Sequence, residues 1–470
     1  MASTSARSMW QLSPDVAVVG LAMIVYIFLF LQRRYRSSLK LAEARLVESE
    51  TGGRVLASTT TEERKAVWKP ASFTYPDIVP LPNELRALEP RPYRPFKAGP
   101  YHITMGIRPM EWDNWIELDN QFPTFHRIRA NRIATRGHKL IRVLPDRPGV
   151  VKGGAEAARE LVYELAEFLS RRYPAVYSVT RHVPSSTPVM VSFEDGWKGE
   201  GRIRDVTIAP LGVKYDLDVE DPLKVAALLV QDDLAVMIEG EDGSYYFQAG
   251  AIIVPGSWRL EDKIGMPLDE IHFSGHVPFY KEKLQLSMNR FFRRLPLEVP
   301  VVRNNWLIQV LDPALQKADG ERADAADPEE LAWSATTHGP EDAYSHPQSS
   351  YALSLSSSVS PPPFPTPPPS LPLPAELPRA PPPTPATLRL RTERQTLRRL
   401  PHSGAIVFTI RTYLVPIEQL SKEKGVPGRL AAAIRGVGGE IRRRKQVEEY
   451  ENVLLGYLDA CDREEGGRLT

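Results

Sequence analysis

The feature that most constrains the fold of this chain is a proline-rich tract in its C-terminal half. Fourteen of the 44 prolines fall between Pro361 and Pro385, and acidic and serine-rich stretches precede them from about Ala318. A segment of this composition cannot bury enough apolar surface to offset its ordering entropy, and its prolines favour an extended polyproline II conformation. We therefore expect residues 313–385 to be a disordered insertion. The strand-like sequence that resumes at Leu388 then continues the domain that the insertion interrupts.

Part of this tract matches a peptide-ligand pattern. Arg379, Pro382 and Pro385 have the basic-x-x-P-x-x-P spacing of ligands that bind aromatic grooves. Because such a match arises almost inevitably among so many prolines, a passive spacer is the simpler interpretation. A polyproline-binding partner is the alternative.

An uncharged and mostly apolar run lies near the N-terminus, at Val16–Leu31. With its flanks, residues 12–32, it is long enough to cross a bilayer as one helix; a signal-peptide core or a buried helix is the alternative. The basic residues between Arg33 and Lys40 follow the run, whereas a cleavable signal carries them before it. The positive-inside rule then predicts a single-pass signal anchor, with the C-terminal part in the cytosol and the endoplasmic reticulum as the expected membrane. Residues 33–75 are expected to form a stalk.

Charge and cysteine content exclude several classes of protein. The 59 basic and 58 acidic residues leave a net charge of +1, which argues against nucleic acid as a partner. The single cysteine, Cys461, cannot form a disulfide framework, a cysteine zinc site or an iron–sulfur cluster within the chain. The sequence also lacks the Walker, GxGxxG, HExxH and GxSxG patterns. Any cofactor must therefore be held by other side chains.

The remaining sequence mixes helical and strand-like periodicities. Residues 76–312 and 386–462 are expected to form one domain in two parts. Helices are predicted from Pro109 to a break at Pro123, over 155–173 with most charges facing water, over 281–294, and over 440–461. A hairpin is predicted at 234–239 and 245–254, and a second strand pair at 387–400 and 404–417. Hairpins beside helices, without regular strand–helix alternation, indicate an α+β domain with a largely antiparallel sheet.

Two groups of side chains have the chemistry of a cofactor site. His272 and His276 are four residues apart in a segment expected to be a loop, where neutral imidazole can bind a metal or move a proton. Two ordinary polar residues are the simpler interpretation of that spacing. An arginine-rich strand pair between Arg389 and Arg411 suits carboxylates or phosphates, and an internal network of ion pairs is the equal alternative.

Four blocks of sequence carry a resemblance to a known family. They are MGIRPMEWDNWIELDNQF, QDDLAVM with AGAIIVPGSWRLEDKIGMPLDEIH, VVRNNWLIQ, and RTERQTLRRLPHSGAIVFTIRTYL. With these blocks in this order, the sequence resembles the haem-dependent oxidative N-demethylase alpha-subunit family of bacteria and filamentous fungi. The anchor and the insertion depart from the bacterial pattern, so we expect a membrane-anchored fungal member.

The resemblance implies a PAS-like sheet that holds haem b and catalyses oxidative demethylation of a small methylated amine. Dioxygen is then the oxidant, formaldehyde is released, and electrons come from NADPH through a separate flavin and iron–sulfur reductase. A single cysteine fits this expectation, because haem needs only one histidine and reduction can be left to a partner. A non-catalytic haem- or small-molecule-binding PAS-like module tethered to a membrane is the alternative.

The resemblance also implies which residues contact the haem. His272, within the matched block, is the expected axial ligand. The other expected contacts are Arg394, Arg398, Arg411 and Lys263 toward the propionates, and Trp258 and Trp306 as walls of the pocket. The alternatives are ion pairs for the arginines, a solvated loop for Lys263 and ordinary core positions for the tryptophans.

Overall fold

The computed structural model describes residues 68–184, 193–256, 258–311 and 382–468, which belong to one compact unit spanning Lys65–Thr470. The predicted anchor, stalk residues 33–67 and nearly all of the predicted insertion lie outside the described residues. Within those residues, none of the helices combines the length and the apolar character that crossing a membrane requires.

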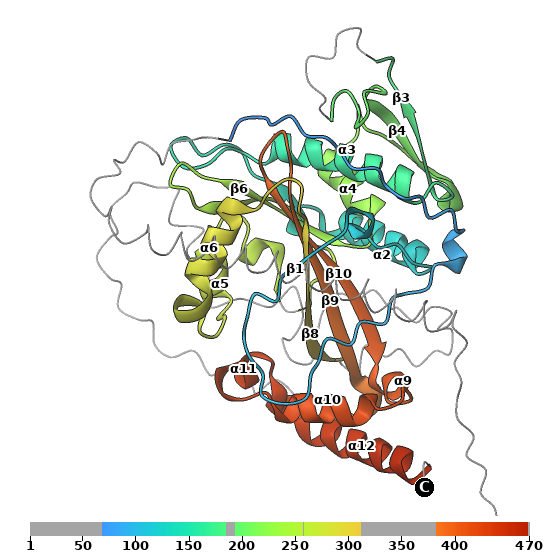
Figure 1. Ribbon diagram of the computed structural model, residues 1–470, viewed down its shortest axis with the longest axis vertical. Coiled ribbons are helices and arrows are strands. Elements are labelled where there is room, and N and C mark those ends of the chain that lie inside the picture. The colour runs from blue at the N-terminus through green and yellow to red at the C-terminus, as the bar shows by residue number, and fades with distance from the viewer. Residues whose placement is uncertain (1–67, 185–192, 257, 312–381, 469–470) are drawn as a thin grey trace, which may run out of the picture. The chain divides into compact units, whose positions relative to one another are not determined.

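Helices and strands follow one another along the chain as Figure 1 shows. The α-helices are α2 (Phe122–Arg136), α3 (Ala155–Arg172), α4 (Pro222–Leu229), α5 (Leu268–Ser274), α6 (Gln285–Arg294), α9 (Ile417–Leu420), α10 (Val426–Arg435), α11 (Gly439–Arg444) and α12 (Val447–Arg468). The strands are β1 (Arg108–Pro109), β2 (Ile141–Val143), β3 (Tyr177–Arg181), β4 (Ile203–Ile208), β5 (Val213–Asp216), β6 (Asp233–Glu239), β7 (Tyr245–Ala251), β8 (Val301–Val310), β9 (Leu388–Arg399) and β10 (Ile406–Pro416). Short 3-10 helices lie at Leu85–Ala87, Trp112–Asn114, Gly137–Lys139, Ala209–Leu211, Leu260–Asp262 and Pro385–Thr387, and a π-helix at Tyr280–Leu284.

A seven-stranded sheet forms the centre of the unit. Its order is β1-β8-β9-β10-β6-β7-β2, and every pair of neighbours is antiparallel. The predicted α+β class with a largely antiparallel sheet is confirmed, as are the helix α3 and both strand pairs. A second sheet of three strands, β3-β4-β5, was not predicted.

The two strands that flank the predicted insertion are neighbours in the main sheet. β8 pairs with β9 along its whole length, and Val310 lies opposite Leu388. The chain therefore leaves the sheet at the end of β8 and returns to the adjacent position. This register is what an insertion between two paired strands of a single domain requires.

The main sheet separates two apolar clusters. Along β6, Leu234 and Val236 pack in the cluster that contains α3 and α4, whereas Ala235 and Met237 pack in the cluster that contains α5 and α6. Side chains alternate across a strand, so successive residues serve opposite faces. A third cluster joins the ends of β8 and β9 to α10 and α12, which lie side by side in Figure 1.

The helix predicted from Pro109 to Pro123 is wrong. Pro109 lies in β1, and Pro123 falls in the first turn of α2, where a missing N–H costs nothing. The intervening segment is mostly irregular, yet Trp115 and Ile116 are fully buried. Side chains satisfy its backbone: Arg394 donates to the Trp115 carbonyl at 3.2 Å and the Tyr173 hydroxyl donates to the Ile116 carbonyl at 3.0 Å.

The predicted C-terminal helix is two helices. α11 ends at Arg444, and α12 begins at Val447. Gln446, between them, has a φ of 50°, which does not occur inside a right-handed α-helix. Gly436 caps the end of α10, and Gly438 precedes α11.

The domain begins before the predicted boundary at residue 76. Phe73 and Tyr75 are buried in the core, so residues 68–75 are part of the domain and not of a stalk. Trp68 packs against the turn between β9 and β10, where Gly404 has φ +70° and a Cβ would collide with the indole ring. Only glycine fits this approach without strain.

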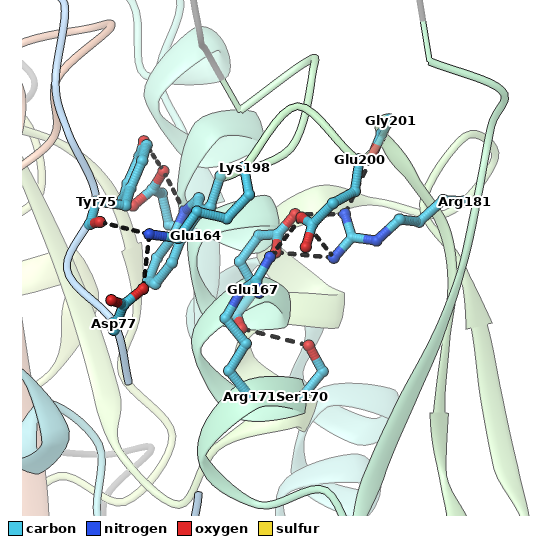
Figure 2. Close-up of polar contacts among 11 residues, drawn as sticks. Tyr75, Asp77, Glu164, Glu167, Ser170, Arg171, Arg181, Lys198, Glu200 and Gly201 are labelled. Atoms are coloured by element: carbon cyan, nitrogen blue, oxygen red, sulfur yellow. Dashed lines mark hydrogen bonds and ion pairs between the residues drawn. The ribbon is translucent and has the colours of Figure 1, made fainter. Parts of the chain in front are cut away.

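Most of the charged side chains of α3 keep contact with water, as predicted, but three of the seven do not. Glu160, Glu164 and Glu167 are buried, and each has polar partners. Figure 2 shows the Tyr75 hydroxyl donating to Glu164, and Arg181 bound to Glu167 at 2.6 Å. These contacts tie α3 to the N-terminal segment and to the second sheet.

Candidate functional site

His272 lies on the short helix α5, where the sequence predicted a loop. Pro267 precedes the helix, and Asp269 in its first turn accepts hydrogen bonds from the Tyr280 hydroxyl at 2.7 Å and the Gln285 side chain at 2.6 Å. A further bond to Asp269 comes from Asn289 at 3.0 Å. This one carboxylate therefore fixes α5 against the π-helix and α6.

The contacts of the His272 ring determine its tautomer. Its Nδ1 lies 2.7 Å from the carbonyl oxygen of Leu268, and since a carbonyl only accepts, Nδ1 must carry the proton. The ring stacks on Tyr280 with centroids 4.7 Å apart and planes 10° apart. Nε2 consequently bears a lone pair, and it has no hydrogen-bond partner among the described residues.

The surroundings also keep His272 uncharged. Burial lowers its pKa to about 4, and the nearby cations Lys263, Arg444 and Arg303 lower it further, against the bond to Leu268. The imidazole is therefore neutral at physiological pH. A neutral imidazole oriented through Nδ1–H, with Nε2 available, is the form that binds a metal.

Lys263, Arg303 and Arg444 lie near this histidine, and Lys445 lies near Arg444, with little compensating charge. Lys263, Arg303, Arg444 and Lys445 all have lowered pKa values, chiefly through burial, to about 8 for Lys263 and about 7 for Lys445. Glu393 is the one carboxylate that raises the pKa of all four cations against the effect of burial. It is already bound by Arg391 at 3.3 Å. The Nε of Arg303 is buried and has no hydrogen-bond partner in the part of the chain that the structure describes. This group has a surplus of positive charge suited to an anion.

The same side chains combine strong desolvation with some remaining exposure. Desolvation on this scale requires protein on most sides of each group. Even so, Lys263, His272, Arg303 and Lys445 are only half-buried and Arg444 is exposed. A side chain that borders a hollow is shielded from water on most sides and still keeps some accessible surface, which reconciles the two observations. We call these five residues the cationic recess.

The two predicted tryptophans border different parts of the recess. The Lys263 ammonium lies 4.6 Å from the ring centroid of Trp258, whereas the Lys445 ammonium lies 4.0 Å from that of Trp306 and donates to its carbonyl oxygen at 2.5 Å. Trp258 packs on the cluster of α5 and α6, and Trp306 is buried in the C-terminal cluster. Each tryptophan therefore packs in an apolar cluster and also contacts one lysine of the cationic recess.

Arg394, Arg398 and Arg411 do not join His272. Leu397 packs with α5 and α6, so its neighbour Arg398 and the alternating Arg394 lie on the opposite face of the sheet, and Arg411 pairs in register with Arg394. Each guanidinium has a carboxylate partner: Glu117 at 3.1 Å for Arg394, Glu164 at 2.6 Å for Arg398 and Asp119 at 2.6 Å for Arg411. These contacts correspond to the ion-pair alternative.

Sequence analysis missed three members of the recess. Arg303 stands in the matched block VVRNNWLIQ, and Arg444 and Lys445 end the basic run RRRK, which forms the last turn of α11 and its C-cap. That run was treated as part of one continuous helix, which would have placed its charges in water. A run of like charges at a helix end was the available signal.

A separate small cavity lies near the end of α2. Its volume is about 10 Å³, enough for one water molecule and no cofactor. It is lined by Arg136, Lys139, Leu140, Ile252, Pro255, Arg259, Leu260 and Glu261. The cationic recess is therefore the stronger candidate site.

Comparison with known families gives one match, described as haem-dependent oxidative N-demethylase, alpha subunit-like. It covers residues 106–455, which is 350 of the 470 residues. The matched range contains the whole main sheet and every residue of the cationic recess.

Proposed function

This chain belongs to the haem-dependent oxidative N-demethylase alpha subunit-like family, and we propose that it binds haem b at the cationic recess and demethylates a small methylated amine. The oxidant in this proposal is dioxygen, and the electrons come from NADPH through a separate flavin and iron–sulfur reductase. The observation that carries the proposal is the neutral His272 imidazole, whose Nδ1 is protonated and which lies near the incompletely neutralised cations Lys263, Arg303 and Arg444.

The residues present fit a haem. His272 Nε2 would bind the iron, because Leu268 holds the proton on Nδ1 and burial keeps the ring neutral. Arg303, Arg444 and Lys263 would bind the two propionates, since Lys445 already donates to the Trp306 carbonyl. Such charge-assisted bonds would also compensate for the burial that chiefly lowers the pKa values of these cations.

The sheet has the arrangement that the family resemblance implies. Five neighbouring strands of the sheet lie in the order β7-β6-β10-β9-β8. If they are numbered 1 to 5 along the chain from β6, this order is 2-1-5-4-3, which is that of a PAS-like sheet. Helices α5 and α6 pack on one face of these strands. His272 is on the helix that covers this face.

When bound, the haem supplies the one-electron and dioxygen chemistry, so that one oxygen atom leaves in formaldehyde and the other in water, with two electrons from NADPH. The chain's residues hold and orient it. Tyr280 fixes the plane of the His272 ring by stacking, and Asp269 fixes Tyr280. The side chains that orient the proposed ligand thus all come from α5 and the segment after it.

The test of this proposal is formaldehyde release. Full-length protein with haem, NADPH, a flavin and iron–sulfur reductase and dimethylamine should produce formaldehyde in proportion to the dioxygen consumed. Omission of the amine should abolish formaldehyde release. Haem-containing protein that consumes no dioxygen with any small methylated amine would instead support the non-catalytic module.

We also propose a membrane location, with residues 12–32 as the anchor in the endoplasmic reticulum and the domain on the cytosolic side. The support is the apolar run at Val16–Leu31 and the basic residues that follow it. Fractionation of cells tests this proposal: full-length protein should require detergent for extraction. Recovery in the soluble fraction at low salt would contradict it.

A further inference from the structure

The surface beside the cationic recess exposes apolar side chains in an unusual backbone. Phe273, Phe279 and Leu286 are 42%, 39% and 73% exposed and lie within 14 residues of one another. Phe279 and His276 have positive φ angles of 54° and 49°, and a π-helix follows at Tyr280–Leu284. Bulky residues rarely adopt such angles, and single-turn π-helices are frequent at functional sites. The backbone here presents Phe279 to solvent at a conformational cost.

A ring of positive charge surrounds these apolar side chains. Over residues 280–294 there are five basic side chains, all exposed, and one acidic side chain, Glu282, in a chain whose net charge is +1. The basic residues are Lys281, Lys283, Arg290, Arg293 and Arg294. None of them forms an ion pair within the part of the chain that the structure describes. We call these cations, together with Phe273, Phe279 and Leu286, the α6 surface.

The helical spacing brings the apolar and basic positions together. Leu286, Arg290 and Arg293 recur at intervals of four and three, which places them on one side of α6. The Lys283 ammonium lies 4.6 Å from the Phe279 ring centroid, so the charge sits over the apolar patch. The opposite side of the helix, with Met288 and Phe292, is buried against the sheet. The exposed side is therefore a small apolar centre with a basic rim.

Two ring contacts connect this surface to His272. The exposed Phe273 ring meets Tyr280 edge-on, with centroids 5.2 Å apart, and Tyr280 stacks on His272. A protein bound at the α6 surface would thus lie close to the proposed iron ligand.

We propose that the α6 surface is the docking site for an acidic electron-donor protein, an inference that rests on the proposed function. Two features favour this occupant. The unpaired cations complement an acidic partner and would accelerate encounter. The small apolar centre fits the limited area of transient electron-transfer complexes. The donor gives one electron at a time to the haem iron, which is reduced from ferric to ferrous as the donor is oxidised.

The test measures electron delivery to the full-length haem protein. A small acidic plant-type [2Fe–2S] ferredoxin, chemically reduced, serves as the probe, and stopped-flow absorbance follows haem reduction. We expect the second-order rate constant to fall steeply with salt. The double substitution Arg290→Glu and Arg294→Glu should lower it about tenfold or more, and Leu286→Ser should lower it by a smaller factor. Lys424→Glu, an equivalent charge reversal at an exposed lysine outside this surface, should leave it unchanged.

Two controls separate this proposal from the proposed function. Reduction by dithionite, which needs no docking, should be equally fast in every variant, and a haem spectrum shows that the cofactor is present. Protein without haem would overturn the proposed function and, with it, this role of the surface. If haem is present but the rate constant of reduction by ferredoxin is the same in the double variant and in Lys424→Glu, the docking proposal alone is overturned. If only binding to phosphatidylserine vesicles is lost in the double variant, the α6 surface is a membrane contact and the proposal fails.

Discussion

The Nδ1 atom of His272 lies 2.7 Å from the carbonyl oxygen of Leu268, one turn earlier in α5. This bond places the ring proton on Nδ1 and leaves Nε2 as an acceptor directed away from the helix backbone. Burial, and then the cations Lys263, Arg444 and Arg303, lower the pKa of His272 and favour its neutral form, while stacking on Tyr280 orients the ring. The local structure therefore holds this imidazole in the neutral form that the proposed haem ligation requires.

The cations of the recess should control haem retention. Replacing Arg303 by Gln or Arg444 by Gln removes one charge-assisted bond to a propionate, which should increase the rate of haem loss to apomyoglobin about tenfold for each substitution. The neighbouring Arg443→Gln is the matched control, because only Arg444 contributes to the lowered pKa of His272. The same substitutions should stabilise haem-free protein by relieving repulsion. If both variants lost haem at the rate of the control, the propionate assignment would be wrong.

Glu160 should give the domain a characteristic pH dependence. Its carboxylate accepts hydrogen bonds from the backbone N–H groups of His402 at 2.7 Å and Ser403 at 2.8 Å, yet burial raises its pKa from 4.5 to about 7, with a further contribution from Glu164. The folded state therefore binds a proton that the unfolded chain releases between pH 4.5 and 7. This stabilisation is complete below pH 4.5 and lost as the pH rises through 7, with an upper bound of about 3 kcal/mol.

Thermal unfolding at pH 5 and pH 8 tests this expectation. The wild type should lose more stability between the two pH values than Glu160→Gln does. Equal losses in the two proteins would show that Glu160 does not titrate in this range.

The contact between Tyr75 and Glu164, visible in Figure 2, should stabilise the domain. Tyr75→Phe leaves a buried carboxylate short of one donor, which should cost about 1–3 kcal/mol in the free energy of unfolding. Lys198→Gln is the control: it loses bonds to the Tyr75 carbonyl and to Asp77, but Asp77 is 95% exposed and such pairs contribute little. Chemical denaturation measures both. A Tyr75→Phe variant as stable as the wild type would place residues 68–75 outside the cooperative unit.

The register of β8 and β9 predicts that the insertion is dispensable for folding. Val310 and Leu388 are opposite one another, so a short linker can replace residues 318–381 while the turn at Thr384–Thr387 is kept. Haem content and thermal stability of that deletion protein should equal those of the full chain. Insoluble protein, or protein without haem, would contradict the spacer interpretation of the segment.

Much of the fold could be predicted from local patterns. The hairpin of β6 and β7, the pair β9 and β10, and the helix α3 have strong periodicity or specific turn residues, and all three were found. The segment Trp115–Asp119 could not be predicted, because its backbone is satisfied by side chains distant in sequence, such as Arg394 and Tyr173. Pro123 was interpreted as a helix break although its position in the first turn is equally favourable.

The candidate site was predicted only in part. His272, Lys263 and Trp258 came from the matched blocks, and the structure places them together. Arg398 on β9 and Arg411 on β10 were also expected at the haem, but they lie on the opposite face of the sheet, where Glu164 and Asp119 are their partners. Which arginines are paired depends on long-range packing, and no local pattern contains that information. To place Arg444 and Lys445 at the site, one would have had to know that the helix is interrupted at Gln446, and helix propensity alone did not indicate this interruption.

The central claim, that His272 is the haem ligand, is tested most directly by the visible absorption spectrum of the full-length protein. The wild type should show a Soret band, His272→Gly should lose or shift it, and added imidazole should restore it by occupying the vacated position. His276→Asn, which keeps a residue suited to positive φ four positions away, should have the wild-type spectrum. An unchanged Soret band in His272→Gly would contradict the account, as would wild-type protein that remains colourless after reconstitution with haem.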